Sequence, residues 1–286
     1  MLTAATLGDV QTYGDWVYDL ALDPTKSSYP TYADGIKTRA DFGADARRSV
    51  TQQNGELLLF SRGGTVEGWI QYFWIPEERY LQLTACSIRE GTAQALTELL
   101  ERLEARFPGY ALYFGFPGEN TQATAFLAAN GFRCIEDDWN YVFDLGGVVP
   151  QAIDAHVVPV RQENYGIFRA LHDQAGEEMY WNSDRIEEHM EEWVIFAYVR
   201  AGKSVGTIFL RGDGGLAEIF GLEFAAEKID VEACRALLAA ALAHTKRLGM
   251  KYLMFLGEAA LRPVLHALGF RCVGRYCCYV RTLPER

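Results

Sequence analysis

The chain has 286 residues, of which 49% are apolar and 23% charged, and a formal net charge of −11. This length allows one large domain or two ordinary ones, and the composition is that of a globular chain able to bury a core. The acidic balance disfavours surfaces that track phosphates, so we expect neither nucleic acid nor a membrane as a partner. Residues 1–6 lack the pattern of a secretory signal, and no apolar run approaches a bilayer span.

Cysteine usage indicates a reducing compartment. The six cysteines are Cys86, Cys134, Cys234, Cys272, Cys277 and Cys278. They show no Cys-x-x-Cys pair and no density typical of a disulfide scaffold. We therefore expect small apolar core residues in a cytoplasmic protein.

The first half of the chain predicts helices followed by strands. Residues 1–50 are expected to form helices and loops, with Tyr13–Leu20 the clearest helical stripe. The later elements are expected to be strands at 57–60, 69–74 and 80–83, a helix at 92–106, a strand at 111–116, a helix at 120–129 and a strand at 133–145. Gly63 and Gly64 indicate a hairpin, and Gly109 and Gly131 follow the ends of the two helices.

The second half repeats this order after a linker. The expected elements are helices at 165–174 and 184–193, strands at 194–199, 205–210 and 217–224, a helix at 231–248, a strand at 252–256, a helix at 259–267 and a strand at 271–282. An early antiparallel hairpin and a later parallel crossover through a helix predict an α+β fold.

Two matches at one offset indicate that a whole domain was duplicated. The string Gly-Phe-Arg-Cys begins at Gly131 and again at Gly269, and the same offset relates the hairpins Ser61–Gly68 and Val199–Gly206. We therefore expect a domain at 1–146, a linker at 147–156 and a second domain at 157–286. Each domain should have a mixed, mostly antiparallel sheet flanked by helices.

One segment carries a family resemblance. Asn120, Ala123, Phe126, Gly131 and Phe132 stand at the spacing Asn-x-x-Ala-x-x-Phe-x-x-x-x-Gly-Phe. This segment resembles that of the GNAT superfamily of acyl-CoA-dependent N-acyltransferases, and the order of elements extends the resemblance to both halves, as tandem GNAT domains. The resemblance implies that Asn120 contacts the pantetheine arm of the cofactor.

The family also has a tyrosine that protonates the departing thiolate. Leu127 stands at that position in the first half and Leu265 in the second. Neither half therefore retains the family's usual acid, and water or a nearby hydroxyl would have to replace it.

The resemblance places the phosphate-binding loop before the long helix of each half. Backbone N–H groups at a helix N-terminus bind a pyrophosphate when no side chain obstructs them. In the first half the expected cofactor-binding residues are Leu83, Arg89, Gly91, Thr92, Ala93 and Asn120. The strand ahead of this loop is expected to splay from its neighbour and expose N–H groups that polarise the thioester carbonyl.

The corresponding loop of the second half is less suited to a phosphate. Glu232 and Cys234 stand at its two small-residue positions. A carboxylate there would cap the helix and repel a phosphate. We therefore expect the first half to be the better binder of acetyl-CoA.

The second half has more of the chemistry that an acceptor requires. Expected acceptor-binding residues are Trp181, Asn182, Asp184 and Arg185, and expected catalytic residues are Glu218 and Glu223. A partly buried carboxylate with a raised pKa would take a proton from an ammonium group. Strand alternation places Glu218 and Glu223 on opposite faces, so at most one faces the cleft. The alternative is that Asn182 or Ser183 caps a helix and both glutamates are solvated.

These observations predict an acetyltransferase. Acetyl-CoA would be the co-substrate and a primary amine of a small molecule the acceptor, in a monomer or homodimer. The five histidines stand singly in the sequence, so no metal is expected. The alternative is a catalytically inactive tandem GNAT-like protein that binds a ligand or a partner, which the missing tyrosines and the altered second loop favour. The acceptor and the catalytic half stay open.

Overall fold

A computed structural model describes residues 1–28, 32–147, 154–174, 180–226 and 228–285. Most of the linker expected at 147–156 therefore lies outside the described residues. By their contacts the residues form two compact units. Unit 1 comprises Met1–Asp138 together with Val273–Arg286, and unit 2 comprises Trp139–Cys272.

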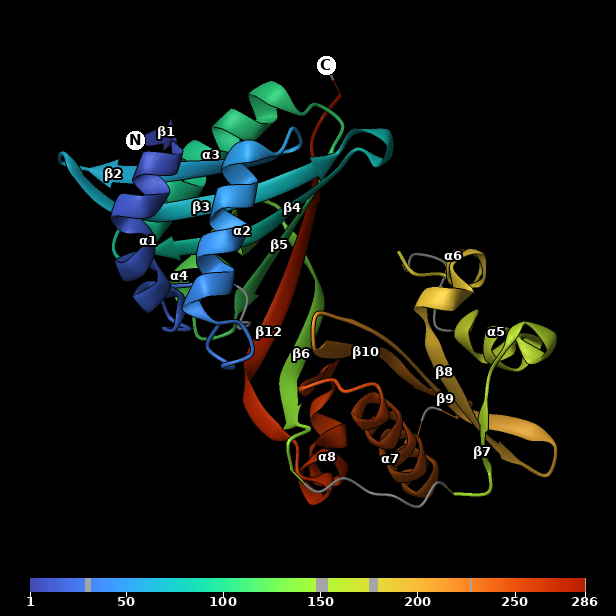
Figure 1. Cartoon of the computed structure of the whole chain (residues 1–286). Coiled ribbons are helices and arrows are strands. Elements are labelled where there is room, and N and C mark those ends of the chain that lie inside the picture. The colour runs from blue at the N-terminus through green and yellow to red at the C-terminus, as the bar shows by residue number, and fades with distance from the viewer. Residues whose placement is uncertain (29–31, 148–153, 175–179, 227, 286) are drawn as a thin grey trace. The chain divides into compact units, whose positions relative to one another are not determined.

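Unit 1 is a mixed sheet with helices on both faces (Figure 1). Its elements are β1 (Leu2–Ala4), α1 (Leu7–Ala21), α2 (Arg39–Thr51), β2 (Gly55–Arg62), β3 (Thr65–Ile75), β4 (Tyr80–Ile88), α3 (Thr92–Arg106), β5 (Ala111–Pro117), α4 (Thr121–Ala129) and most of β12 (Arg271–Thr282). The strand order is β1-β2-β3-β4-β5-β12. Only the β4–β5 pair is parallel.

Unit 2 repeats this plan. Its elements are the second part of β6 (Arg133–Asp144), β7 (Val157–Pro159), α5 (Gly166–His172), α6 (Ser183–Glu188), β8 (Val194–Arg200), β9 (Lys203–Asp213), β10 (Leu216–Phe224), α7 (Val231–Arg247), β11 (Tyr252–Gly257) and α8 (Arg262–Leu268). The strand order is β6-β11-β10-β9-β8-β7, with β10 and β11 parallel. The predicted α+β class is confirmed, and the strands of each unit pair in a mixed, mostly antiparallel order with helices beside them.

Helix α3 shows why the sequence predicted its elements well. Leu96, Leu99, Leu100 and Leu103 recur at helical spacing, and all four are buried in the core of unit 1. The helix begins directly after Gly91, whose φ of 84° a residue with a side chain rarely adopts. Its bounds are those predicted. The helix predicted at 184–193 is shorter, because α6 ends at Glu188 and a 3-10 turn, Met190–Glu192, follows it.

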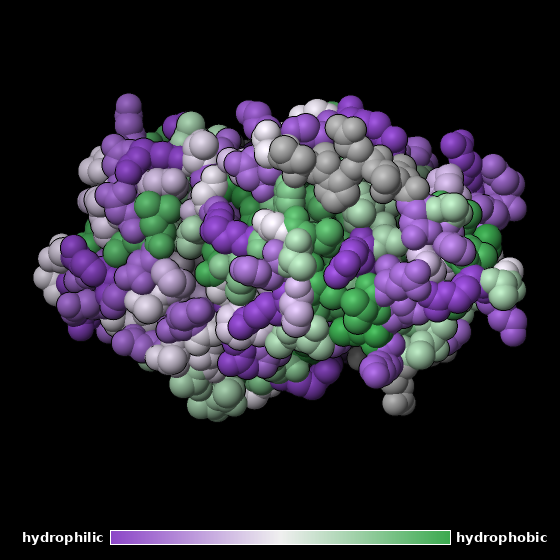
Figure 2. All heavy atoms as spheres, turned by 90° about the horizontal axis from the view of Figure 1, so that it is seen from below, coloured by the Kyte–Doolittle hydropathy of each residue, from purple (hydrophilic) through white to green (hydrophobic). Residues whose placement is uncertain are grey.

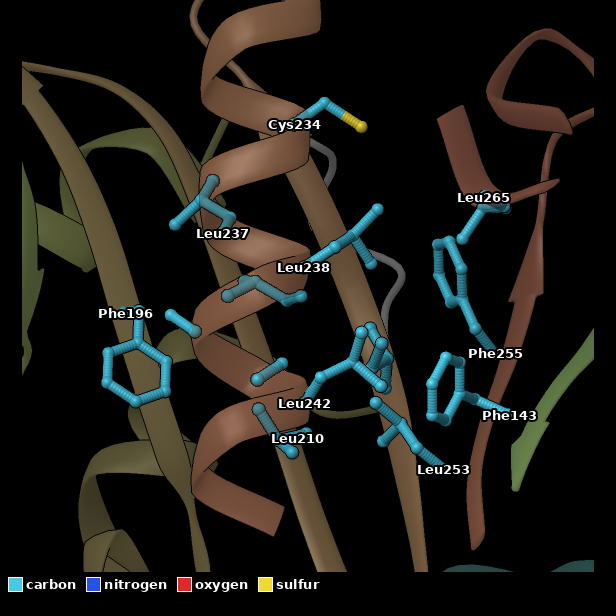
Figure 3. Close-up of a cluster of buried hydrophobic side chains, with 14 of the residues drawn as sticks. Phe143, Phe196, Leu210, Cys234, Leu237, Leu238, Leu242, Leu253, Phe255 and Leu265 are labelled. Carbon is cyan, nitrogen blue, oxygen red and sulfur yellow. The ribbon is translucent and has the colours of Figure 1, made fainter. Parts of the chain in front are cut away.

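The last strand of each repeat completes the sheet of the other unit. In β12, Tyr276–Thr282 pair antiparallel with Ala111–Pro117 of β5. In β6, Trp139–Asp144 pair with Tyr252–Gly257 of β11. Figure 3 shows the consequence for packing, since Phe143 of β6 projects toward Leu242 of α7 in the core of unit 2.

This exchange differs from the predicted division into residues 1–146 and 157–286. The structure divides the chain within β6 and again within β12. The physical reason is that both strands end related repeats and satisfy the backbone hydrogen bonds of either sheet edge. Chain order therefore does not reveal which edge each strand completes.

A β-bulge at the same place in each unit supports the duplication. In β4 the pairing with β3 steps from Leu83 to Ala85, which leaves Thr84 without a partner in the ladder. In β10 the pairing with β9 steps from Ile219 to Gly221, which leaves Phe220 without one. Both bulges lie near the point where the parallel pairing of that strand ends.

No helix among the described residues is suited to span a membrane. None of the helices in the described ranges combines the length and the apolar character that a bilayer span requires. On the face shown in Figure 2, hydrophilic and hydrophobic residues are interspersed. This mixture is ordinary for globular proteins.

The strand exchange predicts how fragments of the chain behave. Residues 1–146 alone lack β12, so β5 loses its partner Tyr276–Thr282. The loss of each cross-strand pair costs on the order of 0.2–1 kcal/mol of stability. We expect this fragment to associate or unfold at low temperature. Residues 1–138 joined to 273–286 by a short Gly-Ser linker should unfold cooperatively at a higher midpoint. Size-exclusion chromatography and thermal unfolding test this, and equal midpoints would contradict the exchange.

Candidate functional site

In unit 2, strand β10 leaves its parallel neighbour at the bulge. Leu216–Ile219 pair with Tyr252–Phe255 of β11, and the pairing ends there. Gly221–Phe224 then continue β10 with β9 on one side, and no described residue pairs with them on the other. These residues, named here the unpaired stretch of β10, are all half-buried. Their backbone groups are therefore partly accessible to a ligand.

In unit 1 another segment of the chain fills the gap where the equivalent parallel strands, β4 and β5, separate. The parallel pairing of β4 and β5 ends at Gln82 and Tyr113. Beyond this point the N–H of Ile88 donates to the carbonyl of Lys26 over 3.0 Å, and the N–H of Ser28 donates to the carbonyl of Cys86 over 2.7 Å. The hydroxyl of Ser28 also accepts from the N–H of Cys86 at 2.7 Å. The segment Lys26–Ser28 thus occupies the position of a further strand.

Asn120 takes part in the same arrangement. Its Nδ2 donates to the carbonyl of Ser27 over 3.0 Å, and its Oδ1 accepts from the N–H of Ala123 at 3.2 Å. The side chain is fully buried. The amide expected to contact pantetheine therefore holds the internal segment and caps α4.

The remaining first-half residues surround the N-terminus of α3. Gly91 offers no side chain to cap the helix, Thr92 is buried and Ala93 is exposed. Arg89 is engaged elsewhere, because its Nε donates to Glu67 Oε2 over 2.9 Å and its guanidinium lies 5.4 Å from the Trp16 ring centroid. Leu83 is a core residue at the bulge.

The N-terminus of α7 carries two carboxylates. Asp230 caps the helix by accepting from the N–H of Ala233 at 3.0 Å, and this hydrogen bond lowers the pKa of Asp230. Arg200 donates to Asp230 over 2.9 Å and to Glu232 over 2.8 Å. Glu232, which was expected to cap this helix, stands at its N-terminus, but Asp230 forms the cap instead. Cys234 is buried in the core (Figure 3).

The bulge places Glu218 and Glu223 on one face of the sheet. Glu218 lies opposite Arg211 and Glu223 opposite Thr207, and these two β9 residues have the same parity. Cross-strand partners share a face, so both glutamates do as well. The predicted opposite orientation was wrong, because the extra residue at Phe220 shifts the alternation by one position.

Glu223 forms a buried pair with a histidine. Its Oε1 lies 2.6 Å from Nδ1 of His172, and its Oε2 accepts from the hydroxyl of Thr207 at 3.2 Å. The His172 side chain is 2% exposed and that of Glu223 14%. His172 also stacks on Phe168, with centroids 4.8 Å apart. Glu223 belongs to the unpaired stretch of β10, so this carboxylate stands beside the accessible backbone.

The surroundings of His172 favour its protonated form. Burial alone would lower its pKa, but the hydrogen bond and the charge of Glu223, together with the Trp181 carbonyl and the charge of Asp173, raise the pKa above its ordinary value. The other ring nitrogen, Nε2, lies 2.8 Å from the carbonyl oxygen of Trp181. Both nitrogens therefore face acceptors, which only the imidazolium satisfies by donating twice.

The acceptor residues expected from the sequence separate into two groups. Trp181 joins the pair through its carbonyl, and its ring packs against Trp193 at 5.2 Å. Asn182 caps α6 by accepting from the N–H of Arg185 at 3.0 Å. Asp184 pairs with Arg169 at 2.7 Å, and the Arg185 guanidinium lies over the Tyr180 ring at 4.3 Å. Only Trp181 therefore adjoins Glu223 through His172.

Sequence reasoning gave no role in the site to two polar residues. His172 stood alone in the sequence, and only the fold brings it to Glu223. Asn140 of β6 lies opposite Leu256, is fully buried, and has no partner for either amide atom among the described residues. A lone asparagine within an aromatic strand was the available signal for it.

The described residues contain one group with the spacing of metal ligands. His189, Glu191 and Glu192 are exposed, and their ligand atoms lie within 4.8 Å of one another. Glu192 already pairs with Arg211 at 3.1 Å. An exposed acidic group of this kind is not by itself a metal site.

No protein-family model and no curated protein matches the chain. Solved structures do. A GCN5-related N-acetyltransferase from Sphaerobacter thermophilus aligns with a TM-score of 0.64 at 14% identity over 100% of this chain and 96% of its own. A tandem GNAT protein from the clavulanic acid biosynthesis pathway aligns with a TM-score of 0.52 at 15% identity over 99% and 98%.

A third likeness covers part of a larger protein. A glucosamine N-acetyltransferase region in a fungal multi-domain β-N-acetylglucosaminidase aligns with a TM-score of 0.58 at 12% identity, over 98% of this chain and 38% of that one. Together these likenesses show the fold. The chain has the GNAT fold twice, in tandem.

The pair of His172 and Glu223 predicts a pH-dependent stability. Because the pKa of His172 is raised on folding, the stabilisation is full below the unfolded value of 6.5 and is lost as the pH rises through the folded pKa. Glu223→Gln should therefore destabilise by about 2 kcal/mol near pH 6 and by less in alkaline solution. Denaturant unfolding across this pH range measures the difference. Glu191→Gln, at an exposed position, is the control, and equal losses at all pH values would refute the pairing.

Proposed function

We propose that the protein transfers an acetyl group from acetyl-CoA to a primary amine of a small molecule, and that unit 2 carries the reaction. The observation that carries this proposal is the Glu223–His172 pair on the unpaired stretch of β10, within a GNAT fold. A carboxylate and accessible backbone donors at one point are what an amine and a thioester require.

Acetyl-CoA suits unit 2 better than unit 1. The half-buried residues Gly221–Phe224 leave backbone groups for the pantetheine arm, and Arg200 stands at the mouth of α7 for the phosphates. Asp230 and Glu232 oppose phosphate there, so binding requires Arg200 to exchange partners. When bound, acetyl-CoA supplies the activated acetyl thioester.

Unit 1 supports the reaction less well. Lys26–Ser28 fill its splay, and Asn120 holds that segment. Acetyl-CoA binding through Arg89, Gly91, Thr92 and Ala93 stays a prediction from the sequence. We propose that unit 1 keeps the fold without the transferase role.

Glu223 is proposed to receive the proton of the incoming ammonium, directly or through water. The neutral amine then attacks the thioester carbon, so that a C–N bond forms and the C–S bond breaks. His172 does not contact the acceptor in this scheme; it positions the carboxylate through Nδ1. Leu265 is fully buried at the position of the family's tyrosine, so water is proposed to carry to the leaving thiolate the proton that the attacking nitrogen loses as the amide forms.

The wider setting is also proposed. The cysteines within the described ranges are all free, which suits a cytoplasmic location. The acceptor is a small amine, and amino sugars, polyamines and amino acids are the classes to screen by thiol release. We propose a monomer or homodimer without a metal or nucleic acid.

Matched tryptophan substitutions identify the half that binds acetyl-CoA. Ala93 and Glu232 are both exposed at the second position of the long helix of their unit. Glu232→Trp should weaken acetyl-CoA binding by about tenfold or more, because the indole covers the helix mouth, whereas Ala93→Trp should leave binding unchanged. Calorimetry measures both. The reverse result would place the acetyl-CoA site in unit 1. If acetyl-CoA gave no heat of binding with the wild-type protein, the inactive alternative would be favoured.

Removing the carboxylate tests the chemistry. Glu223→Gln should lower kcat/KM for the amine by about a hundredfold, with acetyl-CoA affinity unchanged, because general-base catalysis is lost. Glu218→Gln changes a carboxylate in the paired part of β10 and should cost much less. Steady-state thiol release with an accepted amine provides the measurement. Equal losses in the two variants would remove Glu223 from the proposed role.

A further inference from the structure

A cavity in unit 1 lies apart from the proposed transferase site. It has a volume of about 430 Å³ and opens between α2 and strands β3 and β4. This volume is in the range of small-molecule sites. Lys37, Asp45, Arg48, Gln71, Phe73 and Trp74 are among the residues that line it.

The cavity wall is positively charged in an acidic chain. Its ionisable carboxylate and cations are Asp45, Lys37 and Arg48. Asp45 accepts from Lys37 at 3.3 Å and from Arg48 at 3.0 Å, so one carboxylate faces two cations. The chain as a whole carries −11. The excess of one positive charge favours a monoanionic ligand over a phosphate.

Gln71 supplies a buried donor at the cavity wall. Its side chain is 1% exposed, and its Nε2 has no hydrogen-bond partner among the described residues. A buried amide without a partner is costly, and a ligand oxygen in the cavity would satisfy it. Phe73, two residues further along the same face of β3, is half-buried and offers apolar surface.

The equivalent position in unit 2 carries an apolar side chain in place of this amide. Gln71 lies opposite Ala85, and Phe209 lies opposite Gly221, in each case next to the bulge. Phe209 is fully buried and packs against His172 and Trp193. The position that is apolar and closed in unit 2 is therefore polar in unit 1, where it borders a cavity.

We infer that unit 1 binds a small carboxylate that carries an apolar or aromatic group. Gln71 donates to a carboxylate oxygen, Lys37 and Arg48 pair with its charge, and Phe73 contacts its apolar part. The site is distinct from the Glu223–His172 pair and does not depend on acetyl transfer there. Unit 1 thereby keeps a ligand site while Lys26–Ser28 fill its splay.

Calorimetry with the full chain tests this inference. The probe is N-acetylphenylalanine, and the matched neutral probe is N-acetylphenylalanine amide. The carboxylate should bind at least about tenfold more tightly than the amide. Gln71→Leu and Arg48→Gln should each weaken carboxylate binding by a similar factor, whereas Glu223→Gln should leave it unchanged.

Stability measurements keep the result interpretable. Arg48 is largely exposed, so Arg48→Gln should fold normally, and Gln71→Leu should unfold at the same or a higher temperature because it removes a buried donor that lacks a partner. Failure of the carboxylate to bind, equal binding of the neutral amide, tighter binding of inorganic phosphate, or full binding by both variants would each overturn the inference. Loss of binding in Glu223→Gln would also overturn it, by placing the probe in unit 2.

Discussion

The structure depends on the point at which two parallel strands stop pairing. In each unit a crossover helix joins a parallel pair, and the pair separates near a single bulge, at Thr84 in β4 and at Phe220 in β10. Backbone groups left there need partners, because unsatisfied buried amides are costly. Unit 1 satisfies them with Lys26–Ser28, whereas unit 2 leaves its stretch half-buried. The same ancestral geometry thus has two different outcomes.

Electrostatics follow from this geometry. A buried carboxylate is tolerated only when other groups compensate its charge. Glu223 meets this condition through His172 and Thr207, and His172 meets it through Glu223 and the Trp181 carbonyl. The bulge is what brings Glu223 to this face, since one inserted residue reverses the alternation of the strand. The bulge in the backbone is therefore the reason why the ion pair can form.

The duplicated halves also depend on each other through strand pairing. The ladder of Tyr276–Thr282 with β5 and that of Trp139–Asp144 with β11 mean that neither repeat contains its whole sheet. Such an exchange gives the edge strands β5 and β11 a partner from the other repeat.

The sequence by itself determined the elements, their order and the duplication, because side-chain periodicity and glycine stops act locally, as at Leu96–Leu103 and Gly91. It also singled out Glu223 and Trp181. Only the tertiary structure decided that His172 meets Glu223, that Lys26–Ser28 fill one splay, and which sheet each last strand completes. These contacts join residues far apart in the chain, and a one-residue bulge changes which of them share a face. Local patterns carry no record of either.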